Sequence, residues 1–419
     1  MSAHLNTKAL LLAIQADPAH AIAILQHLNP EMVCFFLHES HKSVVESQIP
    51  SALSRMPQRW DWFLTPSPEN FSACHKILAQ GLGPLLTTWN VMPGELVIDL
   101  SNATAGMASA MLLAGFPFSA KVLLFPGFRP SAEHPSEDIA KWLSQSGTSE
   151  NPWDEEAPRM RREACHHFTH GSYDAAARAL HTLEYRVSGG LKPFYRALAD
   201  VALAYGLWDQ LLHRSAWEKL KGGIKALELA SVWGGPPGMD RLIQGLKGNL
   251  RFLERIVLDS QDIKPAVPID LMAWAKRRGD RGRDLEAATQ VLLRALEAFA
   301  QARLFTQYHL KSWDVNLEQL PEGLRDTCRS KYLNDIDGKF RLPLQAQFQV
   351  LAGLGDSFGQ RFVSDWPKMK SLFDAADHAL LGHGFEPIKP ERFHQLYDLV
   401  LKLTGVVPAD LPEFPSFNI

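Results

Sequence analysis

Residues 95–115 read ELVIDLSNATAGMASAMLLAG, and this segment decides the fold. A short apolar run ends at Asp99, a polar turn follows over 101–104, and small residues with helical spacing continue from about Ala105. The run has the length of a buried strand, and the segment after the turn has the composition of a closely packed helix. A strand, a short turn and a helix in this order form the building unit of α/β proteins.

The same alternation runs through the first 125 residues. Apolar runs that we predict to be strands are followed by segments with helical spacing. The predicted strands cover residues 8–14, 32–38, 60–65, 95–100 and 121–125. Because these runs are apolar at consecutive positions, both faces of the sheet should be covered by helices. The sequence therefore predicts an α/β domain with a parallel sheet.

Beyond residue 150 the pattern is helical almost throughout, with apolar residues at spacings of three and four. Residues 126–155 are rich in Pro, Ser, Gly and acidic side chains, a composition typical of a linker. We predict an α/β domain over 1–150, a helical linker domain over 151–265 and a second helical domain over 266–419. The predicted fold class is therefore α/β plus all-α.

The composition excludes several classes of protein. The chain has 43 Lys and Arg against 46 Asp and Glu, so its net charge of −3 gives no overall attraction to nucleic acid or to an anionic membrane. The four cysteines lack CxxC spacing, which argues against a zinc site and a disulfide framework. The amino terminus lacks the pattern of a signal peptide, and no apolar run approaches about 18 residues, so we expect a cytoplasmic protein.

The candidate ligand site lies at the carboxyl ends of three predicted strands, where ligands bind in open parallel sheets. The three loops cover 15–17, 39–41 and 101–104. Their candidate ligand residues are Gln15, Ala16 and Asp17; Glu39 and Ser40; and Ser101, Asn102, Ala103 and Thr104. The third loop leads into a helix whose first N–H groups favour an anion such as phosphate. Its hydroxyl and amide groups are also suited to a ribose or a base. A well-capped helix that binds no ligand explains the local pattern about as well.

The third loop also resembles a motif of CARF domains, which are Rossmann-like domains of CRISPR-associated proteins. The family motif DLTGGTKxM corresponds to DLSNATAGM over 99–107, so that its aspartate, its threonine and Met107 match. The residues that stand in place of two glycines and a lysine are Asn102, Ala103 and Ala105. The resemblance implies a homodimer that binds cyclic oligoadenylate across its interface, with Met107 among the ligand-binding residues.

Four blocks of the helical half resemble, in order, those of the CARF–HEPN ancillary proteins of type III CRISPR systems. The blocks lie within residues 165–403 and include YDAAARALHTL at 173–183 and LLGHGFEPIKPERFHQLYDLVLKL at 380–403. In this family cyclic oligoadenylate is an activating ligand, and it switches on a metal-independent ribonuclease that cleaves single-stranded RNA. The resemblance therefore implies a role in antiviral defence, with no cofactor and no metal.

The ribonuclease of this family uses an arginine and a histidine. The arginine stabilises charge on the scissile phosphate, and the histidine polarises or exchanges a proton with the 2′-hydroxyl or the leaving oxygen. The family block RNxSILAHG corresponds to ADHALLGHG over 376–384. His383 matches the catalytic histidine, Asp377 occupies the asparagine position, and Ala376 stands where the arginine is expected. The candidate catalytic residues are therefore His383, Asp377 and the adjacent His378.

Other arginines are candidates for the missing partner. The candidates with suitable spacing or position are Arg303 with His309, Arg161 with His166, and the flanking Arg361 and Arg392. Three functions stay open at this point: a ribonuclease with a displaced arginine, a nuclease-inactive sensor that signals to a protein partner, and a ring nuclease that cleaves the messenger. In the last case Ser101 and Asn102 would orient a ribose hydroxyl for in-line attack.

Overall fold

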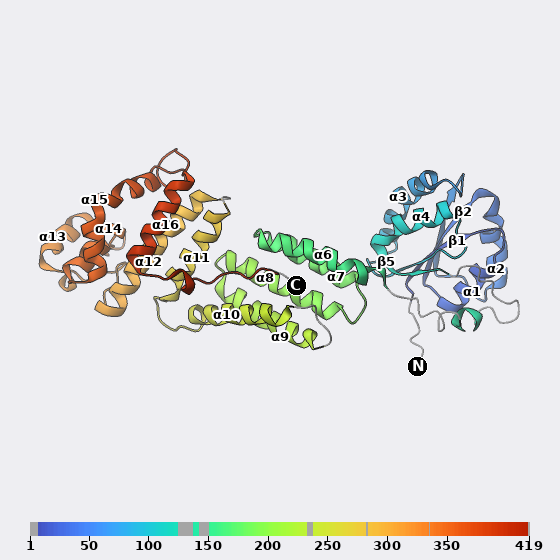
Figure 1. The fold of residues 1–419 in the computed structure, drawn as a ribbon, viewed down its shortest axis with the longest axis horizontal. Helices are drawn as coiled ribbons and strands as arrows, with labels where there is room; N and C mark the ends of the chain where they lie inside the picture. The colour runs from blue at the N-terminus through green and yellow to red at the C-terminus, as the bar shows by residue number, and fades with distance from the viewer. Residues whose placement is uncertain are drawn as a thin grey trace.

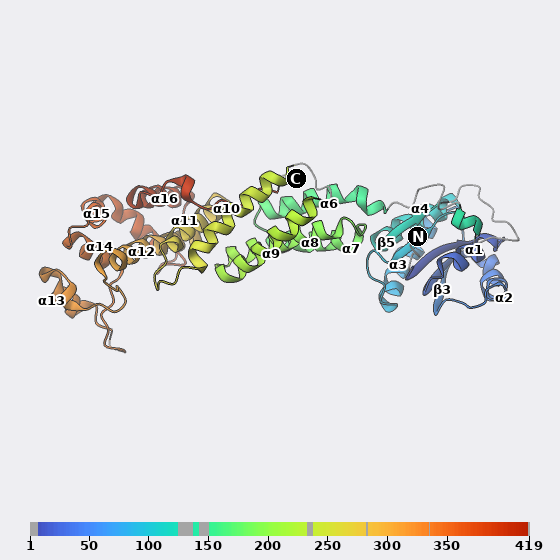
Figure 2. The same cartoon turned by 90° about the horizontal axis from the view of Figure 1, so that it is seen from below.

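The structure is a computed structural model that describes residues 7–124, 137–141, 151–232, 238–281, 284–334 and 336–417. The chain forms an elongated row of three parts (Figures 1 and 2). The sheet with its helices lies at one end, a group of helices occupies the middle, and a second group of helices lies at the other end. Most of the predicted linker, 126–155, lies outside the described residues.

The first part contains a five-stranded sheet in the order β3-β2-β1-β4-β5, and every paired neighbour is parallel. The strands are β1 (Ala9–Ile14), β2 (Met32–His38), β3 (Arg59–Thr65), β4 (Leu96–Asp99) and β5 (Ser119–Leu123). The central strand sets the register, because Leu12 of β1 pairs with Phe35 of β2 and with Asp99 of β4. The predicted parallel sheet is confirmed, although β5 begins two residues earlier than its apolar run indicates.

Helices cover both faces of the sheet, which explains why β1 is buried along its whole length. Two helices pack on one face and two on the other: α1 (Ala19–Leu28) with α2 (Ile49–Ala52), and α3 (Phe71–Thr88) with α4 (Ala105–Gly115). Helix α4 packs against α3, and its first turn lies close to the segment before α3, since a Cβ at Gly106 would lie only 2.5 Å from the carbonyl oxygen of Glu69. The segment after β2, which the alternating pattern predicts to be a helix over 39–53, is broken instead into short helical turns, of which α2 is the last.

The remainder of the described chain is helical, as predicted. The middle helices are α6 (Pro152–Thr169), α7 (Tyr173–Arg186), α8 (Lys192–Asp209), α9 (His213–Ser231) and α10 (Met239–Val257). The last group comprises α11 (Ala266–Asp280), α12 (Leu285–Tyr308), α13 (Glu322–Lys331), α14 (Leu344–Gly353), α15 (Ser357–Asp377) and α16 (Pro390–Thr404). Across the described ranges, no helix combines the length and the apolar character that a membrane crossing requires.

Each helical group has its own apolar core, and two segments connect these cores. Helix α11 contributes Ala266 to the middle core and Leu271 to the last one. The carboxyl-terminal tail returns to the middle helices, where Phe417 stacks on Phe168 at 3.9 Å between ring centroids (Figure 1). The predicted domain boundaries at 150 and 265 stay predictions. Near 265 the two helical groups are not sharply divided, since α11 and the tail contribute to both cores.

Candidate functional site

The predicted ligand loops meet at the carboxyl edge of the sheet. Strands β1, β2 and β4 are neighbours and run in the same direction, so the residues that follow Ile14, His38 and Asp99 share one edge. The order of the strands reverses between β1 and β4, the position where parallel sheets bind ligands. The predicted loop residues are exposed or half-buried here: Gln15, Ala16, Asp17, Glu39, Ser40, Ser101, Asn102, Ala103 and Thr104.

A buried histidine–aspartate pair lies beneath this edge, and sequence reasoning missed it. His20 Nε2 lies 2.7 Å from Asp99 Oδ2, and Asp99 is fully buried while His20 is 7 % exposed. The other carboxylate oxygen of Asp99 accepts a hydrogen bond from the backbone N–H of Ser101 at 2.9 Å. Asp99 therefore joins the start of α1 to the turn after β4 and fixes the shape of that turn. The sequence signal was a carboxylate that ends an apolar strand.

Two polar atoms near the same edge lack partners. The amide Nδ2 of Asn102 and the ring Nδ1 of His41 are both buried, and neither has a hydrogen bond within the described part of the chain. Buried polar atoms are nearly always paired in folded proteins, because an unmet donor or acceptor costs free energy. A ligand at this edge would supply the acceptor that Asn102 lacks.

Several predicted ligand residues have structural roles instead. Thr104 caps α4: its Oγ1 accepts from the N–H of Met107 at 3.2 Å and donates to the carbonyl of Pro68 at 2.5 Å. The side chain of Met107 is buried in the core between the sheet and α4, so it packs rather than facing the edge. Asp17 accepts a hydrogen bond from the first N–H of α1, and it caps that helix as its position indicates.

The second candidate site is the loop that follows α15. Helix α15 presents Phe362, Met369, Phe373 and Ala376 to the core at helical spacing, and Ala376 is 1 % exposed. Its carbonyl accepts a hydrogen bond from Gln290 of α12 at 3.1 Å. The position where the family has its arginine therefore packs into the helical core.

The loop over 379–388 is held tightly. The carboxylate of Glu286 in α12 accepts the backbone N–H of Leu381 at 3.3 Å and that of Ile388 at 2.6 Å. Two glycines allow the turn, since a Cβ at Gly382 would lie 2.4 Å from the carbonyl oxygen of Ala376 and one at Gly384 would lie 2.2 Å from that of His378. The turn thus requires the two glycines, of which Gly384 also matches the family block together with His383.

The three predicted catalytic residues lie together at this loop, and all are exposed. The backbone N–H of His383 donates to the carbonyl of Asp377 at 2.6 Å, which brings the two residues close. His378 differs from them, because its Nδ1 lies 2.7 Å from the carbonyl of Asp374 in the same helix. That contact holds the ring of His378 against its own backbone.

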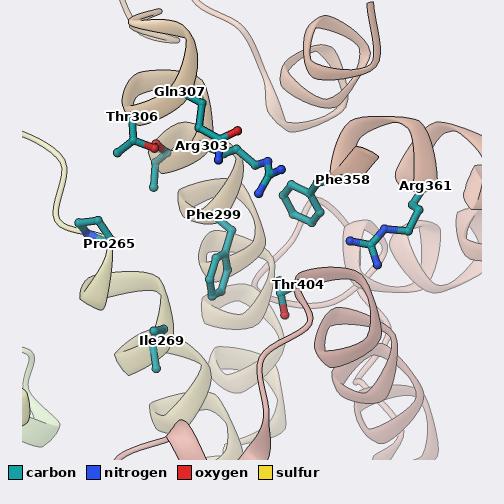
Figure 3. Close-up of a pocket in the computed structure, with 10 residues that line it drawn as sticks. Pro265, Ile269, Phe299, Arg303, Thr306, Gln307, Phe358, Arg361 and Thr404 are labelled. Carbon is teal, nitrogen blue, oxygen red and sulfur yellow. The ribbon is translucent and has the colours of Figure 1, made fainter. Parts of the chain in front are cut away.

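Two of the alternative arginines lie at the other end of the bundle. Arg303 and Arg361 line a cavity of about 300 Å³, with Phe358 between them in Figure 3. Arg361 precedes Asp377 by 16 residues of α15, a distance of about 24 Å along a helix. Arg303 is a similar distance along α12 from Glu286, which holds the loop. Neither arginine can therefore pair with His383 of the same chain.

Arg303 has a structural role. Its Nε donates to Asp356 at 2.7 Å, and the hydroxyl of Tyr308 donates to the same oxygen at 3.0 Å. Burial alone would raise the pKa of Asp356, but hydrogen bonds from Arg303, the backbone of Phe358 and Tyr308 lower it below its ordinary value. Asp356 also caps α15 through the N–H of Phe358, so this network fixes the start of that helix.

The other two arginines differ in their relation to the loop. Arg161 lies on α6 in the middle helices, where its guanidinium is over the ring of Phe194 at 5.9 Å. Arg392 lies in the first turn of α16, directly after the loop that Glu286 holds, and it is exposed. Of the four alternatives, Arg392 is the one that the fold places beside the His383 loop.

Comparison with protein families agrees with this architecture. A model of the Csm6 6H domain matches residues 157–253, the middle helices, and a model of the Csm6 HEPN domain matches residues 260–406, the last group. No curated protein matches the chain. The two domain models match in tandem and together span more than half of the sequence. The chain therefore belongs to the Csm6 family of CRISPR type III CARF–HEPN ancillary proteins.

Proposed function

We propose that this protein senses cyclic oligoadenylate at the carboxyl edge of its sheet. The supporting observation is the unpartnered amide of Asn102, which lies beside the turn that Asp99 and Thr104 fix. Such a donor, next to the N-terminus of α4, is suited to a phosphate or a ribose oxygen of the messenger. The helix N–H groups take over part of the role of the lysine that Ala105 replaces.

The proposal includes a homodimer, because a cyclic ligand with repeated nucleotides suits a site with twofold symmetry. Helix α4 begins at the site and carries an apolar outer face in its last turn: Leu113 is 56 % exposed and Leu112 is 38 % exposed. Contact between two such faces would bury these leucines and bring two copies of the edge together.

We further propose that the HEPN region does not cleave RNA by the arginine–histidine mechanism of its family. The observation that carries this is the buried Ala376, which leaves His383 and Asp377 exposed without a cationic partner in the family position. Without a cation, the negative charge that develops on the scissile phosphate is not stabilised. The protein would then act as a sensor that binds the messenger and signals to a partner protein.

One assay series tests both parts. Calorimetric titration with cyclic tri-, tetra- and hexa-adenylate measures binding, and labelled single-stranded RNA is incubated with the same sample in EDTA. We expect binding of at least one ring and no RNA cleavage. Chromatography of the messenger after long incubation separates sensing from ring cleavage. Absence of binding to every ring would refute the sensor, and cleavage that His383→Ala abolishes would refute the inactive HEPN site.

A second candidate function is a ribonuclease in which Arg392 supplies the cation. Its position in the first turn after the loop favours this reading. In that case Arg392→Ala and His383→Ala should each abolish cleavage, whereas Arg361→Ala at the far end of α15 should leave it unchanged. Cleavage that survives Arg392→Ala would exclude this candidate.

A further inference from the structure

A cavity of about 440 Å³ lies at the junction between the sheet and the middle helices. One wall comes from the amino-terminal edge of the sheet and includes Thr7, Lys8 and Lys121. The other wall comes from the segment between α7 and α8 and includes Arg186 and Lys192. This edge is opposite to the predicted messenger site, and the strands separate the two by about 20 Å.

The lining of this cavity is cationic. Four of its side chains are cations and two are carboxylates: Lys8, Lys121, Arg186 and Lys192 against Glu31 and Glu95. One carboxylate is already neutralised, because Lys8 Nζ lies 2.6 Å from Glu95. Glu31 is exposed. The other three cations therefore lack a matching number of negative charges.

Two polar groups on the sheet side are unpaired among the described residues, and one of them, the Thr7 hydroxyl, is buried. The side chain of Lys121 is 7 % exposed, and it makes no hydrogen bond or ion pair with described residues. The hydroxyl of Thr7 is buried without a partner in the same part of the chain. The ammonium group of Lys121 is partly desolvated and contacts no counter-charge among the described residues, which disfavours its charged form.

The helical side of the cavity also has a buried polar atom without a described partner. The Nε atom of Arg186 is buried and has no partner among the described residues. Its guanidinium lies over the ring of Trp153 at 4.3 Å, which fixes its position. Burial lowers the pKa of Arg186 and that of Lys121, so both charged forms are disfavoured while neither side chain forms an ion pair with a described residue.

We propose that this cavity binds a small phosphate-bearing anion that bridges the sheet and the middle helices. Lys121 and Thr7 would bind it from the sheet, and Arg186 and Lys192 would bind it from the helical side. The volume exceeds that of a single phosphate group, so a di- or triphosphate is the class that fits, whether inorganic or part of a nucleotide. The anion would supply the counter-charge that the protein lacks.

The test compares inorganic pyrophosphate with ATP, each at constant ionic strength, because screening alone alters charged proteins. Calorimetry measures affinity, and hydrogen exchange locates the site. We expect binding with slower exchange of the backbone over 186–189 and over 7–9, and unchanged exchange over 101–104. Tighter binding of ATP would identify a nucleotide as the source, and equal binding would identify the phosphates alone. No binding of either, or protection only at 101–104, would overturn the proposal.

A substitution with opposite effects on stability and binding makes the test sharper. Lys121→Met removes a partly desolvated charge, so we expect a higher Tm of the free protein and an affinity for pyrophosphate reduced at least tenfold. Lys370→Met, on the exposed side of α15, is the matched control and should change neither. Arg186→Gln tests the opposite wall independently of the folding of the first variant. Unchanged affinity in both Lys121→Met and Arg186→Gln would refute the site.

Discussion

The carboxyl edge of the sheet and the loop after α15 each carry a family motif with replaced residues, yet they use their polar atoms differently. At the sheet edge Asn102 and His41 keep buried polar atoms that have no partner among the described residues. At the loop, Glu286 binds two backbone N–H groups, and the ring of His378 contacts its own helix. The first region has polar atoms available to hydrogen-bond a ligand, whereas the polar groups named in the second region are hydrogen-bonded within the protein. This difference is consistent with the proposed function, in which the protein binds a messenger at the sheet edge and does not cleave RNA at the loop.

The largest effect should come from Asp99→Ala, which would remove the buried carboxylate that contacts His20 and accepts the hydrogen bond of the Ser101 N–H. Breaking a buried pair from one side costs about 3–5 kcal/mol. We expect a loss of this size in the free energy of unfolding, measured by urea denaturation, together with loss of cyclic oligoadenylate binding. An equal cost for Asp17→Ala, an exposed cap, would contradict the special role of Asp99.

The next effect should come from Glu286→Ala, which removes the acceptor of two loop N–H groups. Hydrogen bonds to a charged group contribute about 1.5–3 kcal/mol each, and partial hydration of the loop reduces the sum, so we expect a loss of about 3 kcal/mol. Faster hydrogen exchange confined to 379–388 would show that the loop is released. Glu318→Ala, on a distant exposed turn, is the control, and an equal loss there would refute the clamp.

Arg303→Ala should act on stability and its pH dependence rather than on RNA cleavage. Asp356 has a lowered pKa, so it contributes stability that is present above the ordinary carboxyl pKa of 3.8 and is lost as the pH falls below it. Without Arg303 we expect about 2 kcal/mol less stability at pH 7 and a smaller loss between pH 5 and pH 2. Thermal unfolding across this range measures both. An unchanged pH profile would contradict the role of Arg303 as partner of Asp356.

The smallest effect on folding should come from Asn102→Ala, because the amide has no partner to lose in the described structure. Binding should respond instead: we expect about a tenfold weaker affinity for cyclic oligoadenylate, equivalent to about 1.4 kcal/mol. Calorimetry and urea denaturation of the same variant separate the two effects. If Asn102→Ala lost stability but not affinity, the Asn102 amide would have a structural role, and the proposed ligand contact would be contradicted.

Much of the fold follows from the sequence alone. Consecutive apolar residues in runs such as 32–38 can only be buried on both faces, and this fixes a parallel sheet under helices. Apolar spacing of three and four fixes the helical half in the same way. The broken segment after β2 was not predictable, because its apolar residues are too few to specify one long helix.

For the candidate sites too, the sequence determined some features and the tertiary structure decided others. The sequence by itself determined which residues follow the strands and which occupy the positions of the family motifs, because these are local properties of the chain. Only the tertiary structure decided that His20 pairs with Asp99, 79 residues away, that Ala376 is buried, and that Arg303 and Arg361 lie far from His383. The physical reason is that the partners of a polar atom come from distant segments, and only packing determines which atoms remain unpaired.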